Sequence, residues 1–237
     1  MESLQVENLN RWYGRRKGKK LTPYRQNLIN TLLPKLRVDV DFLKDCNNLS
    51  DIFGNNLSEI WLEIGFGYGE HLVFQNEQNP NVGLIGCELF NNGVASLLAY
   101  IDRKKINNIL IFDGDARTLL NVLPAQSLER VFLLFGDPWP KKRHSNRRFV
   151  NQINLNSISR ILKNEGKFLF ASDHVGYLAW TREKMLFHSD FRCISEDVGG
   201  YSLIADGSIR TRYQDKALKK GFESYYLSFE RRIRFEN

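Results

Sequence analysis

Short apolar segments of strand length alternate with segments of helical length from residue 59 onward, and this alternation restricts the possible folds more than any other feature. The predicted strands are 60–64, 82–87, 108–112, 130–135, 167–171, 191–197 and 225–231, and the predicted helices are 70–78, 91–103, 148–163 and 176–188. Strands that are apolar on both faces and separated by helices indicate a mostly parallel sheet with helices on both faces. Because a charged, Gly-containing segment joins the last two strands, we expect these to form an antiparallel hairpin that closes a seven-stranded α/β sheet.

The length of 237 residues suits one compact domain with a short tail. Residues 1–20 are rich in basic side chains and are predicted to form a flexible basic arm, and residues 21–237 a single domain. The first part of that domain, to about residue 56, is predicted to be helical, because its leucines recur at helical spacing at Leu28, Leu32, Leu33 and Leu36.

The chain has no run of 18 apolar residues and begins with a polar stretch, so we expect neither a membrane span nor a secretory signal peptide. Its three cysteines, Cys46, Cys87 and Cys193, are far apart and odd in number, which disfavours both a disulfide framework and a CxxC metal site. The four histidines show no metal-ligand spacing with these cysteines. We therefore predict a cytoplasmic protein that needs no metal.

The strand predicted at 60–64 runs directly into three alternate glycines, Gly65, Gly67 and Gly69. Glycines at such a turn permit positive φ angles and let backbone amides approach a ligand. Their G-x-G-x-G spacing differs from the G-x-G-x-x-G of nicotinamide-dependent dehydrogenases, and Glu63 just before them would repel a pyrophosphate. A carboxylate at this position instead attracts the positive sulfonium and ammonium groups of S-adenosylmethionine.

Carboxylates also follow the next two predicted strands. Glu88 comes directly after the strand 82–87, where a carboxylate can accept hydrogen bonds from both hydroxyls of an adenosine ribose. Asp115 and Ala116 follow the strand 108–112, where the carboxylate can bind the adenine amino group and the next amide a ring nitrogen. The carboxyl ends of parallel strands meet in the crevice where open α/β sheets bind ligands. Together with the glycine turn, these residues predict an S-adenosylmethionine site.

The fourth predicted strand leads into Asp137, in the sequence GDPWPKKRHSNRR of residues 136–148. Pro138 and Pro140 stiffen the exit from the strand and prevent a helix from starting there. Asp137 is therefore predicted to lie at the same edge of the sheet, beside the donor methyl group. Trp139 offers a stacking surface for a base, and the basic run after it could bind phosphates.

Basic residues exceed acidic ones by 34 to 27, and the excess is clustered. Six of the residues 11–20 are basic, as are five of 141–148 and five of 210–220. Clustered cations with aromatic neighbours suit a polyanion, because each neutralised phosphate releases condensed counterions. We therefore expect a nucleic-acid partner, with a set of solvated basic loops as the alternative.

Six segments of the chain together resemble the tRNA (guanine-N(7)-)-methyltransferase family. They read EIGFGYG, GCE, DGDA, DPWPKKRHSNRR, ASD and TRYQ, and the resemblance that rests on their order and spacing covers nearly all of residues 10–235. The resemblance implies a Rossmann-like, S-adenosylmethionine-dependent methyltransferase fold. It further implies methyl transfer to ring nitrogen 7 of a guanosine in the variable loop of tRNA.

The resemblance also implies roles for single residues. It places Glu63, Glu88, Asp115 and Asp137 at the cofactor, with Asp137 also the catalytic group that acts as acid–base or orients the base. It places Lys141, Asp173 and the segment Thr211, Arg212, Tyr213 and Gln214 at the target guanosine. Two positions depart from the family pattern, since Gly136 stands where the family usually has proline and Gln214 where it usually has glutamate.

Two other functions remain as alternatives at this stage. A methyltransferase for an exocyclic amine of a nucleic acid or protein often carries an acid or amide followed by two prolines and an aromatic, a pattern that Asp137-Pro-Trp-Pro resembles distantly. A non-catalytic RNA-binding relative would keep the fold, but it has no need to gather carboxylates toward RNA.

Overall fold

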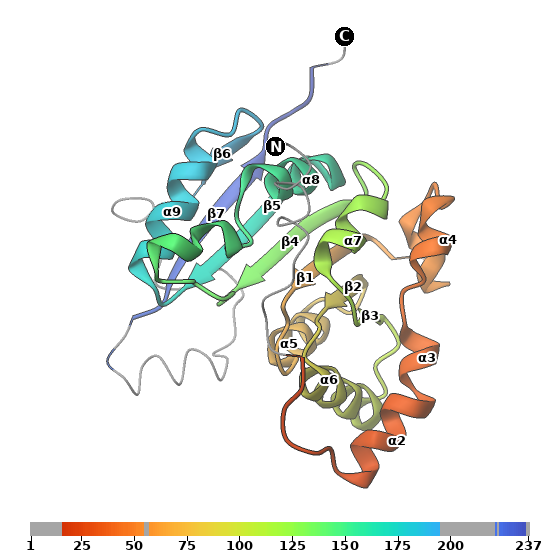
Figure 1. Cartoon of the computed structure of the whole chain (residues 1–237). Helices are drawn as coiled ribbons and strands as arrows, with labels where there is room; N and C mark the ends of the chain where they lie inside the picture. The colour runs from red at the N-terminus through yellow and green to blue at the C-terminus, as the bar shows by residue number, and fades with distance from the viewer. Residues whose placement is uncertain (1–15, 55–56, 195–220, 222, 236–237) are drawn as a thin grey trace, which may run out of the picture.

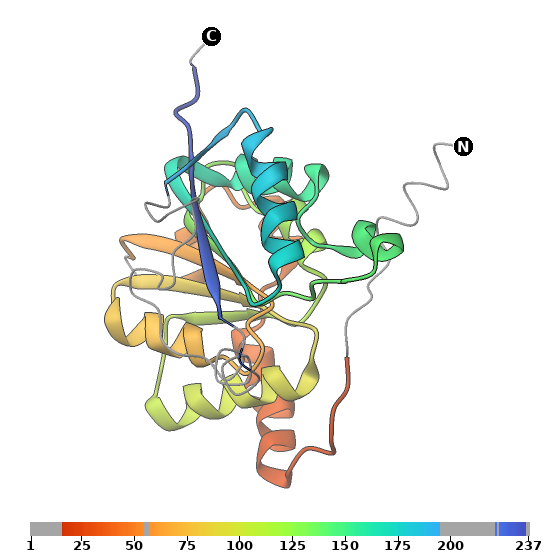
Figure 2. The same cartoon turned by 90° about the vertical axis from the view of Figure 1, so that its left-hand side faces the viewer.

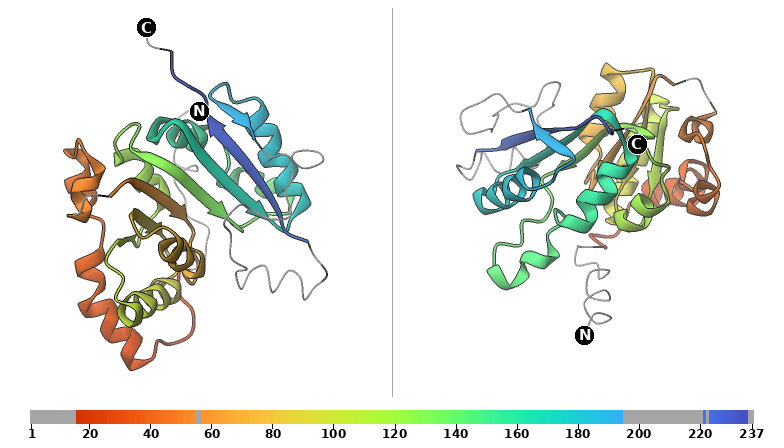
Figure 3. Two further views of the ribbon diagram at one scale, coloured as in Figure 1. Left: turned by 180° about the vertical axis from the view of Figure 1, so that it is seen from behind. Right: turned by 90° about the horizontal axis from the view of Figure 1, so that it is seen from above.

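The computed structural model describes residues 16–54, 57–194, 221 and 223–235. Its centre is one seven-stranded sheet in the order β3-β2-β1-β4-β5-β7-β6 (Figure 1). The strands are β1 (Glu59–Ile64), β2 (Val82–Cys87), β3 (Ile109–Phe112), β4 (Leu128–Leu134), β5 (Leu162–Ser172), β6 (Phe191–Cys193) and β7 (Tyr225–Arg231). Neighbours among β1 to β5 pair in parallel, whereas β7 runs antiparallel to both β5 and β6 (Figure 3). The predicted mostly parallel sheet with a closing antiparallel hairpin is confirmed.

Helices cover both faces of this sheet (Figure 2). The helices that lie between β1 and β6 in the chain are α5 (Glu70–Gln78), α6 (Asn91–Lys104), α7 (Ala116–Val122), α8 (Gln152–Ile161) and α9 (Val175–Leu186). Side chains alternate between two cores, so that Leu62 of β1 packs with α7 and α8 on one face while Trp61 packs with α5 and α6 on the other. This double burial explains why the strands read as continuous apolar runs.

The predicted helical lead-in divides into short helices. They are α2 (Pro23–Thr31), α3 (Leu33–Leu36), α4 (Val40–Lys44) and the 3-10 turn η1 (Leu49–Phe53). Thr22 caps α2 by accepting a hydrogen bond from the Arg25 amide, and Leu28 and Leu33 are buried against the face that carries α5 and α6. Among the described residues, no helix is long and apolar enough to cross a membrane.

Several predicted bounds were wrong, and one helix was missed. The strand predicted at 191–197 is β6, which ends at Cys193, and the strand predicted at 167–171 is β5, which already begins at Leu162. The helix expected at 148–163 is α8 alone, because the Asn151 side chain caps it at the amide of Asn154, and the chain after Ile161 already belongs to β5. The sequence interpretation also missed α7, which Asp115 caps by accepting from the Arg117 amide. An aspartate followed by apolar residues at helical spacing was the available signal for that helix.

The predicted basic arm is described only from residue 16 onward. There it lies across the start of α6, where the Asn91 amide donates to the carbonyl of Arg16 (3.0 Å) and the Gly18 amide donates to Asn92 Oδ1 (2.8 Å). The Asn92 amide group in turn donates to the carbonyl of Lys19 (2.7 Å). Arg16, Gly18 and Lys19 are therefore hydrogen-bonded to the domain.

Candidate active site

The ends of five parallel strands gather most of the predicted site residues at one edge of the sheet. In register, Ile64 of β1 lies beside Cys87 of β2 and Leu133 of β4, and Leu134 of β4 lies beside Ala171 of β5. The residues in the turns that follow these strands therefore lie along the same edge of the sheet. They are the glycine turn after β1, Glu88 after β2, Asp115 after β3, Asp137 after β4 and Asp173 after β5.

The glycine turn has the backbone conformation that its sequence predicted. Gly65, Gly67 and Gly69 have φ angles of 75°, 59° and 88°, which L-residues with a Cβ rarely adopt. The Gly65 amide donates to the carbonyl of Cys87 (2.8 Å), which ties the turn to β2. A Cβ at Gly65 would meet no atom within 4 Å, so the backbone here is open to a ligand.

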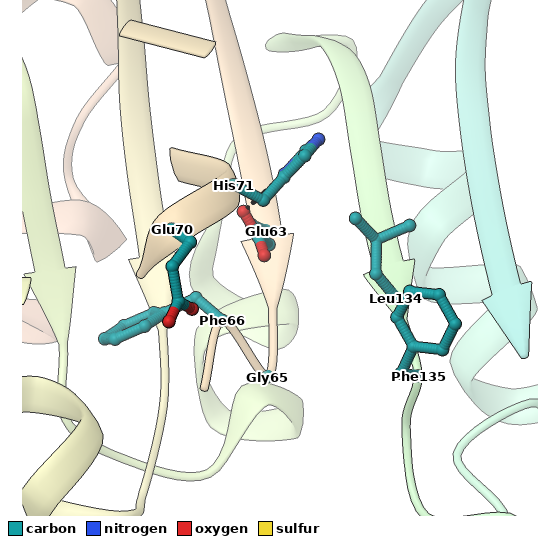
Figure 4. Close-up of a pocket in the computed structure, with 7 residues that line it drawn as sticks. All are labelled: Glu63, Gly65, Phe66, Glu70, His71, Leu134 and Phe135. Carbon is teal, nitrogen blue, oxygen red and sulfur yellow. Dashed lines mark hydrogen bonds and ion pairs between the residues drawn. The ribbon is translucent and has the colours of Figure 1, made fainter. Parts of the chain in front are cut away.

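Glu63 is buried at the end of β1 and lies next to His71 of α5, across a small pocket from Leu134 and Phe135 (Figure 4). His71 Nδ1 is 2.8 Å from Glu63 Oε2, and His71 Nε2 is 3.0 Å from the side-chain nitrogen of Gln75. Since an amide N–H donates to Nε2, Nδ1 carries the ring proton and donates to the carboxylate. His71 is a site residue that the sequence interpretation missed, because only its spacing from cysteines was considered.

Glu88 holds the glycine turn and the start of α6 together. One carboxylate oxygen accepts from the Gly67 amide (2.9 Å), and the other accepts from the amides of Leu89 (2.8 Å) and Phe90 (2.9 Å). Burial raises the pKa of Glu88, and these three hydrogen bonds oppose that shift. The Glu88 side chain is only half-buried, so a ligand at this edge of the sheet can also reach its carboxylate.

Asp115 and Ala116 lie where β3 gives way to α7. The Asp115 carboxylate accepts from the Arg117 amide (3.0 Å) and forms an ion pair with the Arg117 guanidinium. Ala116 is buried in the first turn of the helix. Both are at the predicted edge, but in this structure Arg117 shares the carboxylate that was expected to bind an adenine amino group.

Asp137 follows β4 and is exposed, on a loop of otherwise mostly half-buried residues whose backbone is unusual. Phe135 and Trp139, on either side of it, have φ angles of 55° and 43°, a region that bulky residues rarely occupy. The Phe135 amide donates to the carbonyl of Ala171 (2.8 Å), so the loop begins against β5. Although Asp137 reaches the surface, burial of its carboxyl by the surrounding protein raises its pKa.

The residues predicted at the target base are placed in part. Asp173 is exposed directly after β5, next to the strand that leads to Asp137. Lys141 is exposed at the start of the 3-10 turn η2 (Lys142–Arg147), and its carbonyl accepts from the His144 amide (2.8 Å). Thr211, Arg212, Tyr213 and Gln214 lie outside the described residues.

The basic run after Trp139, which was predicted to bind phosphates, is exposed only in part. Lys142 and Arg143 are exposed, and the Arg147 guanidinium lies 5.0 Å from the centre of the Trp139 ring. Arg148, in contrast, is buried with 8% of its surface accessible and donates to the carbonyl of Pro138 (2.9 Å). Only the exposed part of the run can contact a polyanion.

The donor set fits a cationic, adenosine-bearing cofactor rather than a metal ion. The open glycine backbone lies between two carboxylates, Glu63 and Glu88, which suit positive groups and hydroxyl donors respectively. No group of three or more histidine, cysteine, aspartate or glutamate side chains within the described residues is placed to hold a metal ion.

Comparisons with known proteins point to a family of methyltransferases. The family described as "Putative methyltransferase" matches residues 58–227. A tRNA (guanine-N(7)-)-methyltransferase from Rhodospirillum rubrum is 41% identical over 226 residues, which cover 94% of this chain and 89% of that protein. Another with this name, from Rhizobium meliloti, is 42% identical over 220 residues, which cover 93% of this chain and 94% of that protein.

Solved structures share the fold at much lower identity. The 16S rRNA methyltransferase KamB superposes with a TM-score of 0.54 at 14% identity, over 83% of this chain and 95% of that chain. An antibiotic-related methyltransferase gives a TM-score of 0.52 at 15% identity, with the same two coverages. These likenesses confirm the predicted methyltransferase fold.

Proposed function

This chain belongs to the tRNA (guanine-N(7)-)-methyltransferase family, and from that premise we propose that the carboxyl edge of its sheet transfers a methyl group to ring nitrogen 7 of a tRNA guanosine. The six sequence segments thus predicted the family correctly. The observation that supports the proposal most is the convergence of the glycine turn, Glu63, Glu88, Asp137 and Asp173 on one edge of the sheet.

S-adenosylmethionine is the proposed methyl donor, and it would supply an electrophilic methyl group on a positive sulfur. The turn at Gly65, Gly67 and Gly69 would approach it through backbone amides. Glu63, held by His71, would attract its positive groups, and Glu88 would accept from the ribose hydroxyls. Asp115 and Ala116 would bind the adenine. The Asp115 carboxylate would then have to accept a hydrogen bond from the adenine amino group while it keeps its ion pair with Arg117.

The acceptor needs positioning more than activation. Ring nitrogen 7 of guanine carries an exposed lone pair, so no strong base has to remove a proton before the new N–C bond forms. The protein must hold that nitrogen in line with the methyl carbon at near-attack distance. A base inside a folded RNA must first be unstacked, and Trp139 offers an aromatic surface in place of its lost neighbours.

Asp137 and Asp173 are the proposed groups that stabilise the transition state. Methylation moves positive charge onto the guanine, so carboxylates that accept from its Watson–Crick edge bind the transition state more strongly than the substrate. The two aspartates follow neighbouring parallel strands, β4 and β5. We assign Asp137 the catalytic role of orienting and stabilising the base, and Asp173 a role in binding it.

We assign the tRNA contacts to basic surfaces that flank this edge. Lys141, Lys142 and Arg143 are exposed on the loop that follows Asp137, and the basic residues 16–20 lie across the start of α6, directly after Glu88. The segment Thr211, Arg212, Tyr213 and Gln214 is proposed to complete the guanosine site. We also propose that residues 1–20 form a basic arm and that residues 21–237 form a single methyltransferase domain.

The direct test is incubation of the purified protein with methyl-labelled S-adenosylmethionine and tRNA that lacks modifications, followed by digestion and nucleoside analysis. We expect the label in 7-methylguanosine. Label in an exocyclic methylamine would favour the alternative class of methyltransferase. Binding of tRNA without either cofactor binding or label would favour a non-catalytic RNA-binding protein.

A further inference from the structure

Arg148 is buried beneath the loop that carries Asp137, and its guanidinium reaches two segments of the active-site edge. Nε donates to the carbonyl of Pro138 (2.9 Å), and the two terminal nitrogens donate to the carbonyls of Trp139 (3.4 Å) and Gly176 (3.5 Å). Pro138 directly follows Asp137, and Gly176 lies in the first turn of α9, three residues after Asp173. One side chain therefore links the backbones that present the two aspartates.

The surroundings of Arg148 suit a structural cation rather than an RNA contact. Its guanidinium carbon lies 5.5 Å from the centre of the Tyr177 ring and 5.1 Å from that of Trp180, both on α9. Trp180 is itself fixed, since its indole N–H donates to the carbonyl of Val150 (2.7 Å). Within the described residues no carboxylate forms an ion pair with Arg148.

The loop above Arg148 needs such support. The positive φ angles of Phe135 and Trp139 cost free energy and persist only where surrounding contacts impose them. The planar fork of an arginine can donate to two neighbouring carbonyls at once, which a lysine ammonium cannot do in a fixed plane. Beyond this anchor the green turn η2 projects away from the sheet (Figure 2), so contacts at its base must set the direction of the loop.

We propose that Arg148 is a positioning residue for methyl transfer, which holds the Asp137 loop and the start of α9 in a fixed relative orientation. This inference rests on the proposed function, because it takes Asp137 and Asp173 as the groups that hold the target base. It separates Arg148 from the neighbouring cations Lys142 and Arg143, which are exposed and face the solvent.

The test compares Arg148→Lys and Arg148→Met with a matched control, Arg160→Lys. Arg160 also donates to backbone carbonyls, those of Leu123 (2.8 Å) and Leu120 (2.6 Å), but it does so between α7 and α8, away from the active-site edge. We expect kcat to fall about 10- to 100-fold in Arg148→Met and less in Arg148→Lys, since small misplacements of reacting groups have effects of that order. Arg160→Lys is expected to lose stability without a comparable loss of kcat.

A second measurement distinguishes positioning from RNA contact. The salt dependence of tRNA binding counts neutralised phosphates, so its slope should be unchanged in Arg148→Met and smaller in the double variant Lys142→Gln and Arg143→Gln. A smaller slope in Arg148→Met would overturn the proposal, as would a kcat no lower than that of Arg160→Lys.

A third readout does not depend on activity. Hydrogen exchange of peptides spanning 135–141 and 173–178 should accelerate in Arg148→Lys and remain at the wild-type rate in Arg160→Lys. Faster exchange in a protein whose wild type methylates no tRNA would contradict the proposed function while supporting the anchor. Unchanged exchange in an active protein would contradict the anchor alone.

Discussion

The ring of His71 lies between the side chains of Glu63 and Gln75. Its Nδ1 is 2.8 Å from Glu63 Oε2, and its Nε2 is 3.0 Å from the side-chain nitrogen of Gln75. All three are buried, and the ring also packs edge-on against Phe132 of β4 at 4.8 Å between ring centres. Glu63 thus places a carboxylate at the pocket that it lines together with Gly65 and Phe66, although the side chain itself is buried. A charge held in this way needs its hydrogen-bond partner, because burial of an unpaired carboxylate is costly.

The first prediction concerns this partner. His71→Leu keeps the volume of the side chain roughly constant but removes the donor to Glu63. We expect the free energy of unfolding to fall by about 1–3 kcal/mol, the usual cost of an unsatisfied buried group, and the affinity for S-adenosylmethionine to fall as well. Urea denaturation and calorimetric titration measure the two effects.

His188→Leu is the matched control for that prediction. His188 is also buried and hydrogen-bonded, to Asn156 of α8, but it lies after α9, away from the glycine turn. It should lose stability with no change in cofactor affinity. Wild-type cofactor affinity in His71→Leu would mean that Glu63 does not depend on His71 for binding.

A second prediction follows from the raised pKa of Asp137. Transfer requires the ionised carboxylate, so the acid limb of the kcat profile should have its midpoint above the ordinary aspartate pKa of 3.8. In Asp137→Asn the limb should disappear and kcat should fall by about 100-fold or more, since a positioned polar catalytic group is lost. Single-turnover rates across pH provide the measurement.

The same pKa shift predicts the effect of Asp137 on stability. Because burial raises the pKa in the folded protein, the stabilising contribution of Asp137 is present below its unfolded pKa and is lost as pH rises through the folded value. At neutral pH the ionised carboxylate no longer contributes. Asp137→Asn should therefore melt at the wild-type temperature or higher, and a marked drop would show that the loop depends on the charge.

The third prediction concerns the anchored part of the basic arm. Replacement of Lys17, Lys19 and Lys20 by glutamine should weaken tRNA binding and flatten its salt dependence, because phosphate contacts set that slope. The control is the same exchange at three exposed lysines elsewhere, Lys35, Lys44 and Lys105. Equal slopes for the two triple variants would show that the arm makes no special contact with RNA.

The fourth prediction uses the departure from the family pattern at Gln214. A glutamate offers a charged acceptor for the guanine edge, whereas Gln214 offers a neutral carbonyl and a donor. Gln214→Glu should raise kcat/KM about 2- to 10-fold, equivalent to about 0.4–1.4 kcal/mol, on one unmodified tRNA. A lower efficiency caused by KM alone would instead place this residue near phosphate.

The order of elements was predictable from the sequence because it depends on local patterns. Strands apolar on both faces, such as β2, are visible as unbroken runs, and both β2 and α5 were predicted with their observed bounds. The glycine turn was equally visible, since only glycine adopts the φ angles found at Gly65, Gly67 and Gly69 without strain. The short helix α7 was missed because its seven residues form just under two helical turns, too few for a clear apolar period.

The sequence by itself determined the α/β architecture, the family and the set of carboxylates that follow the parallel strands. Each of these depends on the order and spacing of residues along the chain. Only the tertiary structure showed which residues of the same type are buried and hydrogen-bonded and which are exposed. In sequence, Arg148 belongs to the same basic run as Lys142 and Arg143, yet α9 brings Tyr177 and Trp180 over its guanidinium and buries it. His71 likewise acquires its partner Glu63 only when α5 folds back onto β1. Burial and pairing depend on contacts between segments far apart in the chain, and a local sequence pattern does not predict such contacts.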